Sequence, residues 1–253
     1  MSEKRAYPAS LITNENKLWV TGGVNLYPYM FFSSTEYILE NGESVKGPEL
    51  PLGVAGHTVN AINSTLSMFI GGVIESRNSI NLTYYYDHYN QVWFDGPRLN
   101  VARSYHGAGI VTDMITREKF VVVTGGKYYD DASGNQYFCS TEILIDGTWV
   151  LGNKKGGMSI DGQADRQLSS HFSLSGPNLP RAIDAHSMLE YGNSLLLIGG
   201  VINSSSNDPE ISNLILSLTC EARICFWTEL SQKLSVGRLG MVTAIIPDSM
   251  ANC

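Results

Sequence analysis

A diglycine that ends a β-rich apolar run occurs four times along the chain, and this repeat constrains the fold more than any other feature. The four runs are KLWVTGGV, LSMFIGGV, KFVVVTGGK and SLLLIGGV, and their glycines are Gly22, Gly23, Gly71, Gly72, Gly125, Gly126, Gly199 and Gly200. The last interval exceeds the other two, and a Gly/Ser/Asp-rich stretch at 152–173 accounts for the excess. A fixed internal period predicts a repeat architecture, here with one insertion in the third repeat.

Other positions align once the diglycines are superposed. Short alternating segments precede each diglycine, and three of them contain a histidine, at His57, His106 and His186. Three of the units also contain a tryptophan after the diglycine, at Trp93, Trp149 and Trp227. Each unit therefore predicts four short strands, the content of one β-propeller blade. The predicted units are 5–48, 53–97, 103–177 and 181–231, and the segment 238–246 repeats the first strand of a fifth.

Both marks of the repeat have structural explanations. Consecutive glycines at the end of a strand permit backbone conformations barred to other residues and allow close approach of neighbouring strands. A tryptophan offers a large apolar face that can fill the space between twisted blades. We therefore assign the repeated glycines and tryptophans to the framework, and expect the repeated histidines to serve packing and hydrogen bonding rather than a metal.

A diglycine followed some twenty residues later by a tryptophan resembles the kelch-repeat family. The first unit departs from this pattern, because Val45 stands near the expected tryptophan position. The resemblance implies an all-β, kelch-type β-propeller, with residues 1–253 forming one domain of four complete four-stranded blades. Such propellers commonly close with about six blades. Either this ring closes with four or five blades, the chain is a fragment of a larger propeller, or the last strand joins the first blade.

Composition agrees with an all-β fold and narrows the partner classes. Charged residues make up only 16% of the chain, while 25 glycines and 13 tyrosines favour short strands and tight turns. The formal net charge of −7, without a Lys/Arg cluster, argues against nucleic acid. The sequence contains no apolar run of about 18 residues, so we do not expect it to insert into a membrane. The start of the chain also lacks the apolar core of a signal peptide.

The motif content favours binding over catalysis. The sequence lacks the GxSxG, HExxH and phosphate-binding-loop motifs, so we expect neither an enzyme nor a cofactor nor a metal. The loops after the diglycines should open on one face, where aromatic and Arg side chains are typical interface anchors. The predicted partner-binding residues are Tyr27, Tyr29, Phe31, Arg77, Tyr128, Tyr129 and Tyr137.

The resemblance to the kelch family suggests a specific binding function and one alternative, enzymatic function. Many kelch propellers are substrate adaptors joined to a BTB domain, which implies a protein-interaction scaffold whose partner the sequence does not identify. Other kelch-like propellers belong to enzymes of the galactose oxidase group. The alternative function is therefore a carbohydrate-active or copper-dependent enzyme, although no copper-ligand motif can be carried over onto these residues.

Cysteines and sequons favour an extracellular setting over a cytoplasmic one. Cys220 and Cys225 flank a short turn between two predicted strands, at a spacing that permits a disulfide. Sequons of the form N-x-S/T begin at Asn63, Asn81 and Asn203, which makes the chain a candidate glycoprotein. The absence of a signal peptide fits a truncated start as well as a cytosolic protein.

Overall fold

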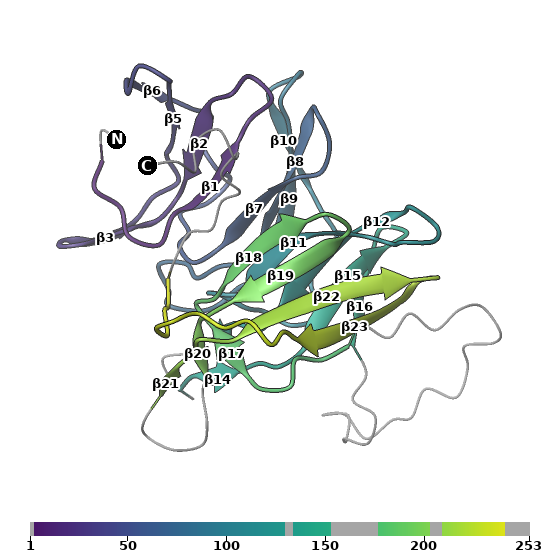
Figure 1. Ribbon diagram of the computed structural model, residues 1–253. Helices are drawn as coiled ribbons and strands as arrows, with labels where there is room; N and C mark the ends of the chain where they lie inside the picture. The colour runs from purple at the N-terminus through teal and green to yellow at the C-terminus, as the bar shows by residue number, and fades with distance from the viewer. Residues whose placement is uncertain (1–2, 130–133, 153–176, 203–208, 241–253) are drawn as a thin grey trace.

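All regular elements of the structure are β-strands. The computed structural model describes residues 3–129, 134–152, 177–202 and 209–240, and these segments contain 23 strands and no helix (Figure 1). The predicted all-β class is therefore confirmed. None of the described segments forms a helix long and apolar enough to cross a membrane.

Four four-stranded antiparallel sheets form the body of the protein, and in each the second strand ends directly before a diglycine. Sheet 1 contains β1 (Ala9–Ile12), β2 (Leu18–Thr21), β5 (Thr35–Ile38) and β6 (Ser44–Lys46). Sheet 2 contains β7 (Thr58–Ala61), β8 (Leu66–Ile70), β9 (Thr83–Asp87) and β10 (Val92–Asp95). Sheet 3 contains β11 (Gly107–Thr112), β12 (Lys119–Thr124), β15 (Thr141–Ile145) and β16 (Thr148–Leu151). Sheet 4 contains β18 (Ser187–Tyr191), β19 (Ser194–Ile198), β22 (Ile215–Glu221) and β23 (Ile224–Glu229).

Short strands also form in the segments that follow three of the diglycines, which the sequence predicts only as loops. They are β3 (Val24–Leu26) with β4 (Tyr29–Phe31), β13 (Lys127–Tyr128) with β14 (Gln136–Tyr137), and β20 (Val201–Ile202) with β21 (Glu210–Ile211). A further short strand, β17 (Ile183–Asp184), precedes the fourth diglycine and pairs with β20. Backbone pairing therefore gives these connections a defined geometry at one edge of the sheets.

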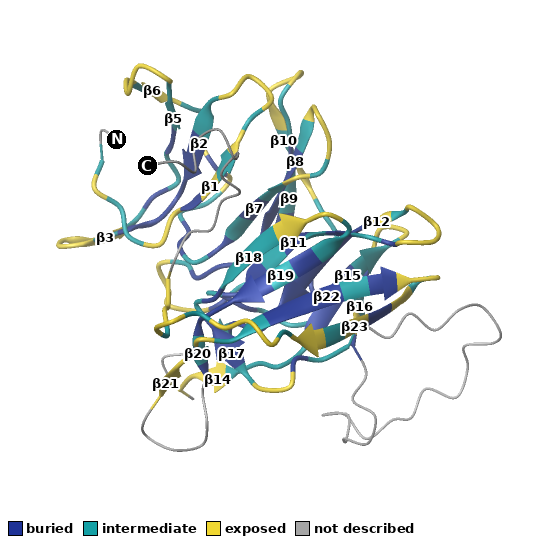
Figure 2. Cartoon of the chain, viewed as in Figure 1, coloured by how far each residue is buried: buried dark blue, intermediate teal, exposed yellow. Residues whose placement is uncertain are grey.

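Many of the buried residues lie on the strands of the four sheets (Figure 2). Their apolar side chains form clusters between neighbouring sheets. Between sheets 1 and 2, the fully buried Trp19 lies 6.1 Å from Trp93, ring centroid to ring centroid. Trp149 lies in the cluster between sheets 2 and 3, and Trp227 packs against the cluster between sheets 3 and 4. In the first unit, Ser44 occupies the tryptophan position, because it pairs with Ile38 as Trp93 pairs with Tyr86, and the neighbouring Val45 is exposed. Trp19 supplies the large ring for this part of the core from β2 instead.

The first glycine of each diglycine has a left-handed backbone, and Gly22, Gly71 and Gly125 face the next unit. At Gly71, with φ of +56°, an added Cβ would lie 2.6 Å from Arg103 O and 2.9 Å from His106 Cε1. At Gly125, with φ of +62°, it would collide with Ile183 O and lie 2.9 Å from His186 Cε1. The repeated histidine therefore fills the space that the glycine leaves open, and the two positions depend on each other.

Equivalent residues of successive units form a continuous series of backbone hydrogen bonds. Gly56 N donates to Tyr7 O (3.0 Å), Tyr105 N to Gly56 O (2.8 Å), Ala185 N to Tyr105 O (2.9 Å) and Gly240 N to Ala185 O (2.8 Å). All five residues have a positive φ, between 52° and 60°. The first strands also contact each other in order, β1 with β7, β7 with β11 and β11 with β18. Consecutive sheets are therefore related by the same structural step.

A buried arginine network occurs in sheets 1 and 3. Arg103 Nη1 donates to Gly125 O (2.8 Å) and Ser140 O (3.2 Å), while Nη2 donates to Glu142 Oε1 (2.8 Å). Arg5 makes the same bonds in sheet 1, to Gly22 O (2.7 Å), Ser34 O (2.9 Å) and Glu36 Oε1 (2.8 Å). Both arginine side chains are fully buried, so the sheets carry two ion pairs that the diglycine pattern does not predict.

Two predicted boundaries fall partly outside the described residues. Of the insertion predicted at 152–173, only Gly152 is among the described residues. After it, Leu179 N donates to Cys139 O (2.7 Å), and this bond is equivalent to the one from Leu50 N to Ser33 O (2.8 Å) in the first unit. Of the strand predicted at 238–246, residues 238–240 are described. Arg238 O accepts from Gly200 N (2.7 Å), as Arg103 O accepts from Gly72 N (2.9 Å). This segment therefore occupies the position of the next unit's start.

Candidate partner-binding face

The segments after the diglycines lie at the same end of their sheets, because each follows the second strand of its unit. We call this surface the diglycine-loop face. It comprises the β3–β4 hairpin, the turn 74–78, the β13–β14 pair and the β20–β21 pair.

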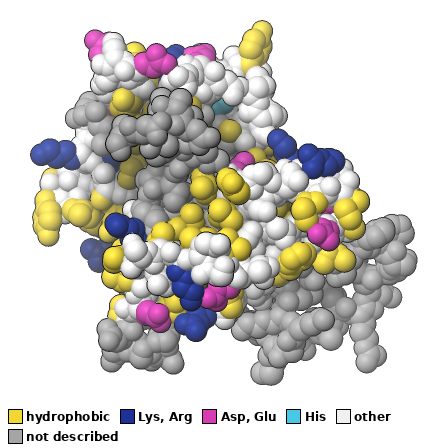
Figure 3. Space-filling view, in the orientation of Figure 1, with side chains coloured by type: hydrophobic (Ala, Val, Ile, Leu, Met, Phe, Trp, Pro, Cys, Tyr) yellow, Lys and Arg dark blue, Asp and Glu magenta, His cyan; other side chains and the backbone are white. Residues whose placement is uncertain are grey.

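The β3–β4 hairpin exposes an apolar tip. Tyr27 is 91% exposed and Tyr29 is 49% exposed, and Leu26 and Met30 beside them are also exposed. Figure 3 shows hydrophobic side chains at the left edge of the molecule, where Figure 1 places β3. Phe31 is half-buried and packs against the cluster of Val24, Ala55 and Val73. The tip is therefore available for contact, whereas the base of the hairpin belongs to the core.

Side-chain contacts connect the first three loops. The Arg77 guanidinium lies over the Tyr29 ring, 5.2 Å from its centroid. Ser79 N donates to Tyr129 O (3.1 Å), and Tyr129 N donates to Ser79 Oγ (2.9 Å). The structure thus connects three of the predicted residues to adjacent loops, while Tyr128 is half-buried in β13.

A charged and aromatic cluster lies where the third and fourth loops meet. Lys127 Nζ is 4.7 Å from the centroid of the Tyr105 ring and 5.7 Å from that of Tyr137, and it forms an ion pair with Asp184 (3.2 Å). The Tyr105 ring meets Tyr7 edge to face at 5.1 Å between centroids. Burial raises the pKa of Tyr105, with Tyr7 adding to the shift, so this phenol is neutral at pH 7.

Four residues of this cluster were missed from the sequence: Tyr7, Tyr105, Lys127 and Asp184. Lys127 directly follows a diglycine, and the other three lie shortly before or at the repeated histidine position. Alignment of the repeat units could have identified these residues, because equivalent positions of successive units are neighbours in the hydrogen-bonded series described above. Asp130 and Asp131 of the third loop lie outside the described residues.

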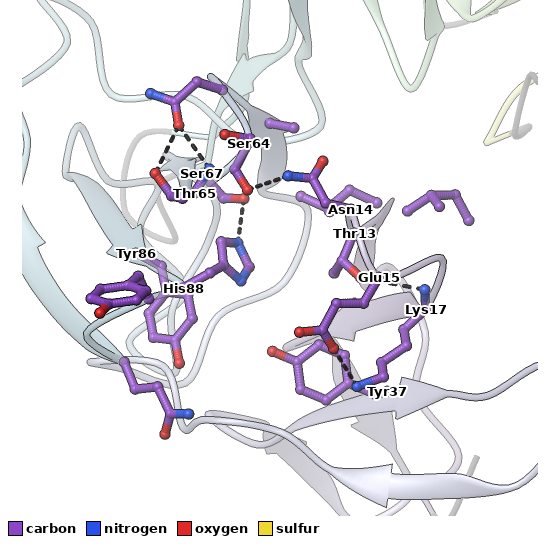
Figure 4. A pocket seen from close by; sticks show the side chains of 16 residues that line it. Thr13, Asn14, Glu15, Lys17, Tyr37, Ser64, Thr65, Ser67, Tyr86 and His88 are labelled. Carbon is purple, nitrogen blue, oxygen red and sulfur yellow. Dashed lines mark hydrogen bonds and ion pairs between the residues drawn. The ribbon is translucent and has the colours of Figure 1, made fainter.

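A pocket of about 370 Å³ lies between sheets 1 and 2, at the end opposite the diglycine-loop face (Figure 4). One wall comes from sheet 1 and the turn after β1, and the other from sheet 2. The labelled residues are Thr13, Asn14, Glu15, Lys17 and Tyr37 on the first wall, and Ser64, Thr65, Ser67, Tyr86 and His88 on the second. A hydrogen bond from Asn14 Nδ2 to Ser64 O joins the two walls.

The groups in this pocket balance in charge. Burial lowers the pKa of His88, although Asp87 and Glu15 oppose the shift, so the ring is neutral at pH 7. Lys17 pairs with Glu15, and burial raises the pKa of Tyr37 to about 12. His88 Nε2 and Ser67 Oγ are 2.8 Å apart, but Ser67 is almost fully buried. This bond holds the imidazole against sheet 2 rather than presenting a nucleophile to the pocket.

The three repeated histidines are buried and bound to the framework where hydroxyls are available. His57 Nε2 lies 2.9 Å from Thr21 Oγ1, and His106 Nε2 lies 3.1 Å from Thr58 Oγ1. Burial lowers the pKa of His57 and His186 to about 3, which keeps these rings neutral. Among the described residues, no group of three His, Cys, Asp or Glu side chains is arranged to hold a metal ion.

The structure pairs Cys220 and Cys225 in a disulfide across the β22–β23 hairpin, with the Cα atoms 4.0 Å apart. Both residues are buried in the cluster between sheets 3 and 4. Cys139 is a free, half-buried thiol. The bridge therefore belongs to the core between two sheets and lies at the end of sheet 4 opposite the diglycine loops.

No family model matches the chain, and no curated protein matches it. A solved structure described as "Structure of YjhT" matches 88% of this chain and 68% of that chain, with a TM-score of 0.67 and 14% sequence identity. YjhT is a β-propeller protein. At this identity the match shows the fold alone, which is all-β and similar to a β-propeller.

Proposed function

We propose that this chain is a non-enzymatic scaffold that binds a protein partner through its diglycine-loop face. The observation that carries the proposal is the exposed tip of the β3–β4 hairpin, where Tyr27 and Tyr29 extend from a base packed in the core. Exposed apolar patches on soluble proteins mark interaction sites. Aromatic and Arg side chains are the commonest interface anchors, and Arg77 lies directly against Tyr29.

We further propose that the framework beneath this face is a kelch-type β-propeller whose blades are the four sheets. The support is the hydrogen-bonded series from Tyr7 to Gly240, which relates consecutive sheets by one repeated step. The similarity to YjhT agrees with it. Propellers hold variable loops on fixed blades, and binding residues are found disproportionately on such loops.

Titration against a captured partner tests the assignment of the face. The partner is recovered with the parent chain, and its affinity is then measured for Tyr27→Ala and Tyr29→Ala. Each change should weaken binding by about 1–3 kcal/mol, or roughly 5- to 150-fold, as for interface anchors. Because both side chains are largely exposed, neither change should move the melting temperature by more than a few degrees.

The matched control is Tyr191→Ala. Tyr191 is 63% exposed at the end of β18, on the opposite edge of the molecule. This variant, with Asn41→Ala and Asn90→Ala in turns on the same edge, should bind within about 0.5 kcal/mol of the parent, as ordinary surface changes do. Loss of affinity confined to these three controls would place the partner on the other face and refute the proposal.

A further inference from the structure

The structure distinguishes two sequons that are equivalent by sequence. Asn63-Ser64-Thr65 and Asn81-Leu82-Thr83 both satisfy the N-x-S/T pattern of N-linked glycosylation. The third sequon begins at Asn203, outside the described residues. The fold places the first two in different environments, and the difference lies in how each asparagine uses its side-chain amide.

Asn63 uses its amide oxygen and leaves its nitrogen unengaged. It is exposed in the turn between β7 and β8. Its Oδ1 accepts from Thr65 N (2.9 Å), Leu66 N (2.9 Å) and Thr65 Oγ1 (3.2 Å). Within the described residues, no hydrogen bond of Asn63 uses Nδ2. The atom that would accept a glycan is therefore Asn63 Nδ2, while Oδ1 of the same amide stabilises the turn.

In Asn81, the side-chain nitrogen Nδ2 is engaged in a hydrogen bond that stabilises the fold. Its Nδ2 donates to Leu99 O (3.1 Å), and Leu99 N donates back to Asn81 O (2.9 Å). Leu99 is buried in the core between sheets 2 and 3. Thr83, the hydroxyl residue of this sequon, is also buried and donates to Pro97 O (2.7 Å). A glycan on Asn81 Nδ2 would remove the bond to Leu99 and displace that side chain.

We propose that Asn63 is an N-glycosylation acceptor in this fold and that Asn81 is not. The donor class is a lipid-linked oligosaccharide diphosphate. The bond between Asn63 Nδ2 and C1 of the first sugar forms as the bond between C1 and the phosphate oxygen breaks. Nδ2 loses one proton, and the lipid diphosphate departs with the bonding electrons. The buried Cys220–Cys225 disulfide fits the oxidising compartment in which this transfer occurs.

The position of Asn63 leaves the diglycine-loop face uncovered. Its turn joins the first two strands of sheet 2, whereas the diglycine of that sheet ends the second strand at the other end. A glycan there extends from the edge that also carries the pocket between sheets 1 and 2. Glycosylation and partner binding therefore use opposite ends of the molecule, and their tests are independent.

Site mapping in secreted protein tests the proposal. The full chain is expressed behind a secretion signal in eukaryotic cells, and amidase removal of glycans in ¹⁸O-labelled water converts each occupied asparagine to labelled aspartate. Label is expected at Asn63 and not at Asn81. An unlabelled Asn63, or a labelled Asn81 in protein that retains the parent melting temperature, overturns the proposal.

Sequon variants separate modification from folding. Thr65→Ala should abolish the label at Asn63, because it removes the hydroxyl residue, whereas Thr65→Ser should retain it. Asn81→Gln should leave the Asn63 label unchanged while lowering the melting temperature, through loss of the bond to Leu99. If Thr65→Ser loses the label as completely as Thr65→Ala, the sequon is not read at this turn and the assignment fails.

Discussion

Gly125→Ala, compared with Gly192→Ala, tests the structural role of the diglycine repeat. Both glycines have φ of +62°, but the space at Gly192 is open, whereas a Cβ at Gly125 meets Ile183 O and His186. The left-handed backbone costs an alanine about 1–2 kcal/mol, and reduced freedom of the unfolded chain offsets about 0.4–1 kcal/mol. Gly192→Ala should therefore destabilise by about 0.5–1 kcal/mol.

Gly125→Ala has the same backbone cost and adds a collision. Ile183 O accepts the hydrogen bond from Gly126 N (2.8 Å), so this carbonyl cannot retreat without weakening the contact between sheets 3 and 4. Overpacking of this kind costs about 1–3 kcal/mol. The difference between the two variants should therefore be about 2 kcal/mol.

Urea denaturation followed by tryptophan fluorescence measures this difference, with the m-value as a check that the unfolding transition is unchanged. Because both glycines have the same φ, the cost of backbone strain cancels in the comparison. The remaining difference in free energy of unfolding reports the packing of Gly125 against the next unit. If the two free energies of unfolding agree within about 0.5 kcal/mol, the diglycine does not depend on the neighbouring sheet and the reasoning is refuted.

Two further predictions concern the junction of sheets 3 and 4. Asp113 accepts bonds from the backbone N–H groups of Ile115, Thr116, Ala222 and Arg223; burial opposes ionisation, but these bonds lower its pKa below the usual value. Asp113→Asn should therefore cost about 2–3 kcal/mol at pH 7. Because the pKa is lower in the folded state, this advantage of the parent is present above the pKa of an unfolded aspartate, about 4, and should shrink as the pH falls below it. A pH-independent difference in the free energy of unfolding would contradict the assignment. Cys225→Ala should cost about 2 kcal/mol relative to the oxidised parent, as expected for a short disulfide loop, and equal urea midpoints for the oxidised and reduced parent would contradict it.

The repeat was predictable from the sequence because its glycines are set by backbone geometry. A left-handed residue in contact with a neighbouring carbonyl tolerates little but glycine, so Gly71 and Gly125 stand out without knowledge of their partners. Each repeated histidine ring lies beside the first glycine of the preceding unit, at the place that a Cβ on that glycine would need. The four long strands of each unit were predicted from the same alignment of the repeats.

The ion pairs and the short hairpins were not predictable in this way. Arg103 and Glu142 are far apart in sequence, and only the pairing of strands within sheet 3 brings them together, so no local pattern reveals a buried pair. The β3–β4 and β13–β14 strands contain two or three residues each, too few for alternation to be read. Trp19 was likewise overlooked as core, because it lies before a diglycine rather than after one.

The buried arginines also explain why the first and third loops can present side chains in fixed positions. Arg5 lies over the Phe32 ring at 4.9 Å, and Arg103 lies over the Phe138 ring at 5.4 Å, each distance measured to the ring centroid. Each phenylalanine directly follows the last short strand of its loop, β4 or β14.

The same guanidinium therefore binds the diglycine carbonyl, the acidic residue of the third long strand and the base of the aromatic loop. Units 2 and 4 have Val54 and Ile183 at the equivalent position, so neither has a guanidinium there. Side chains held in place before binding lose less conformational entropy when a partner docks. If the partner docks on the proposed face, these buried arginines favour loops one and three as its anchors.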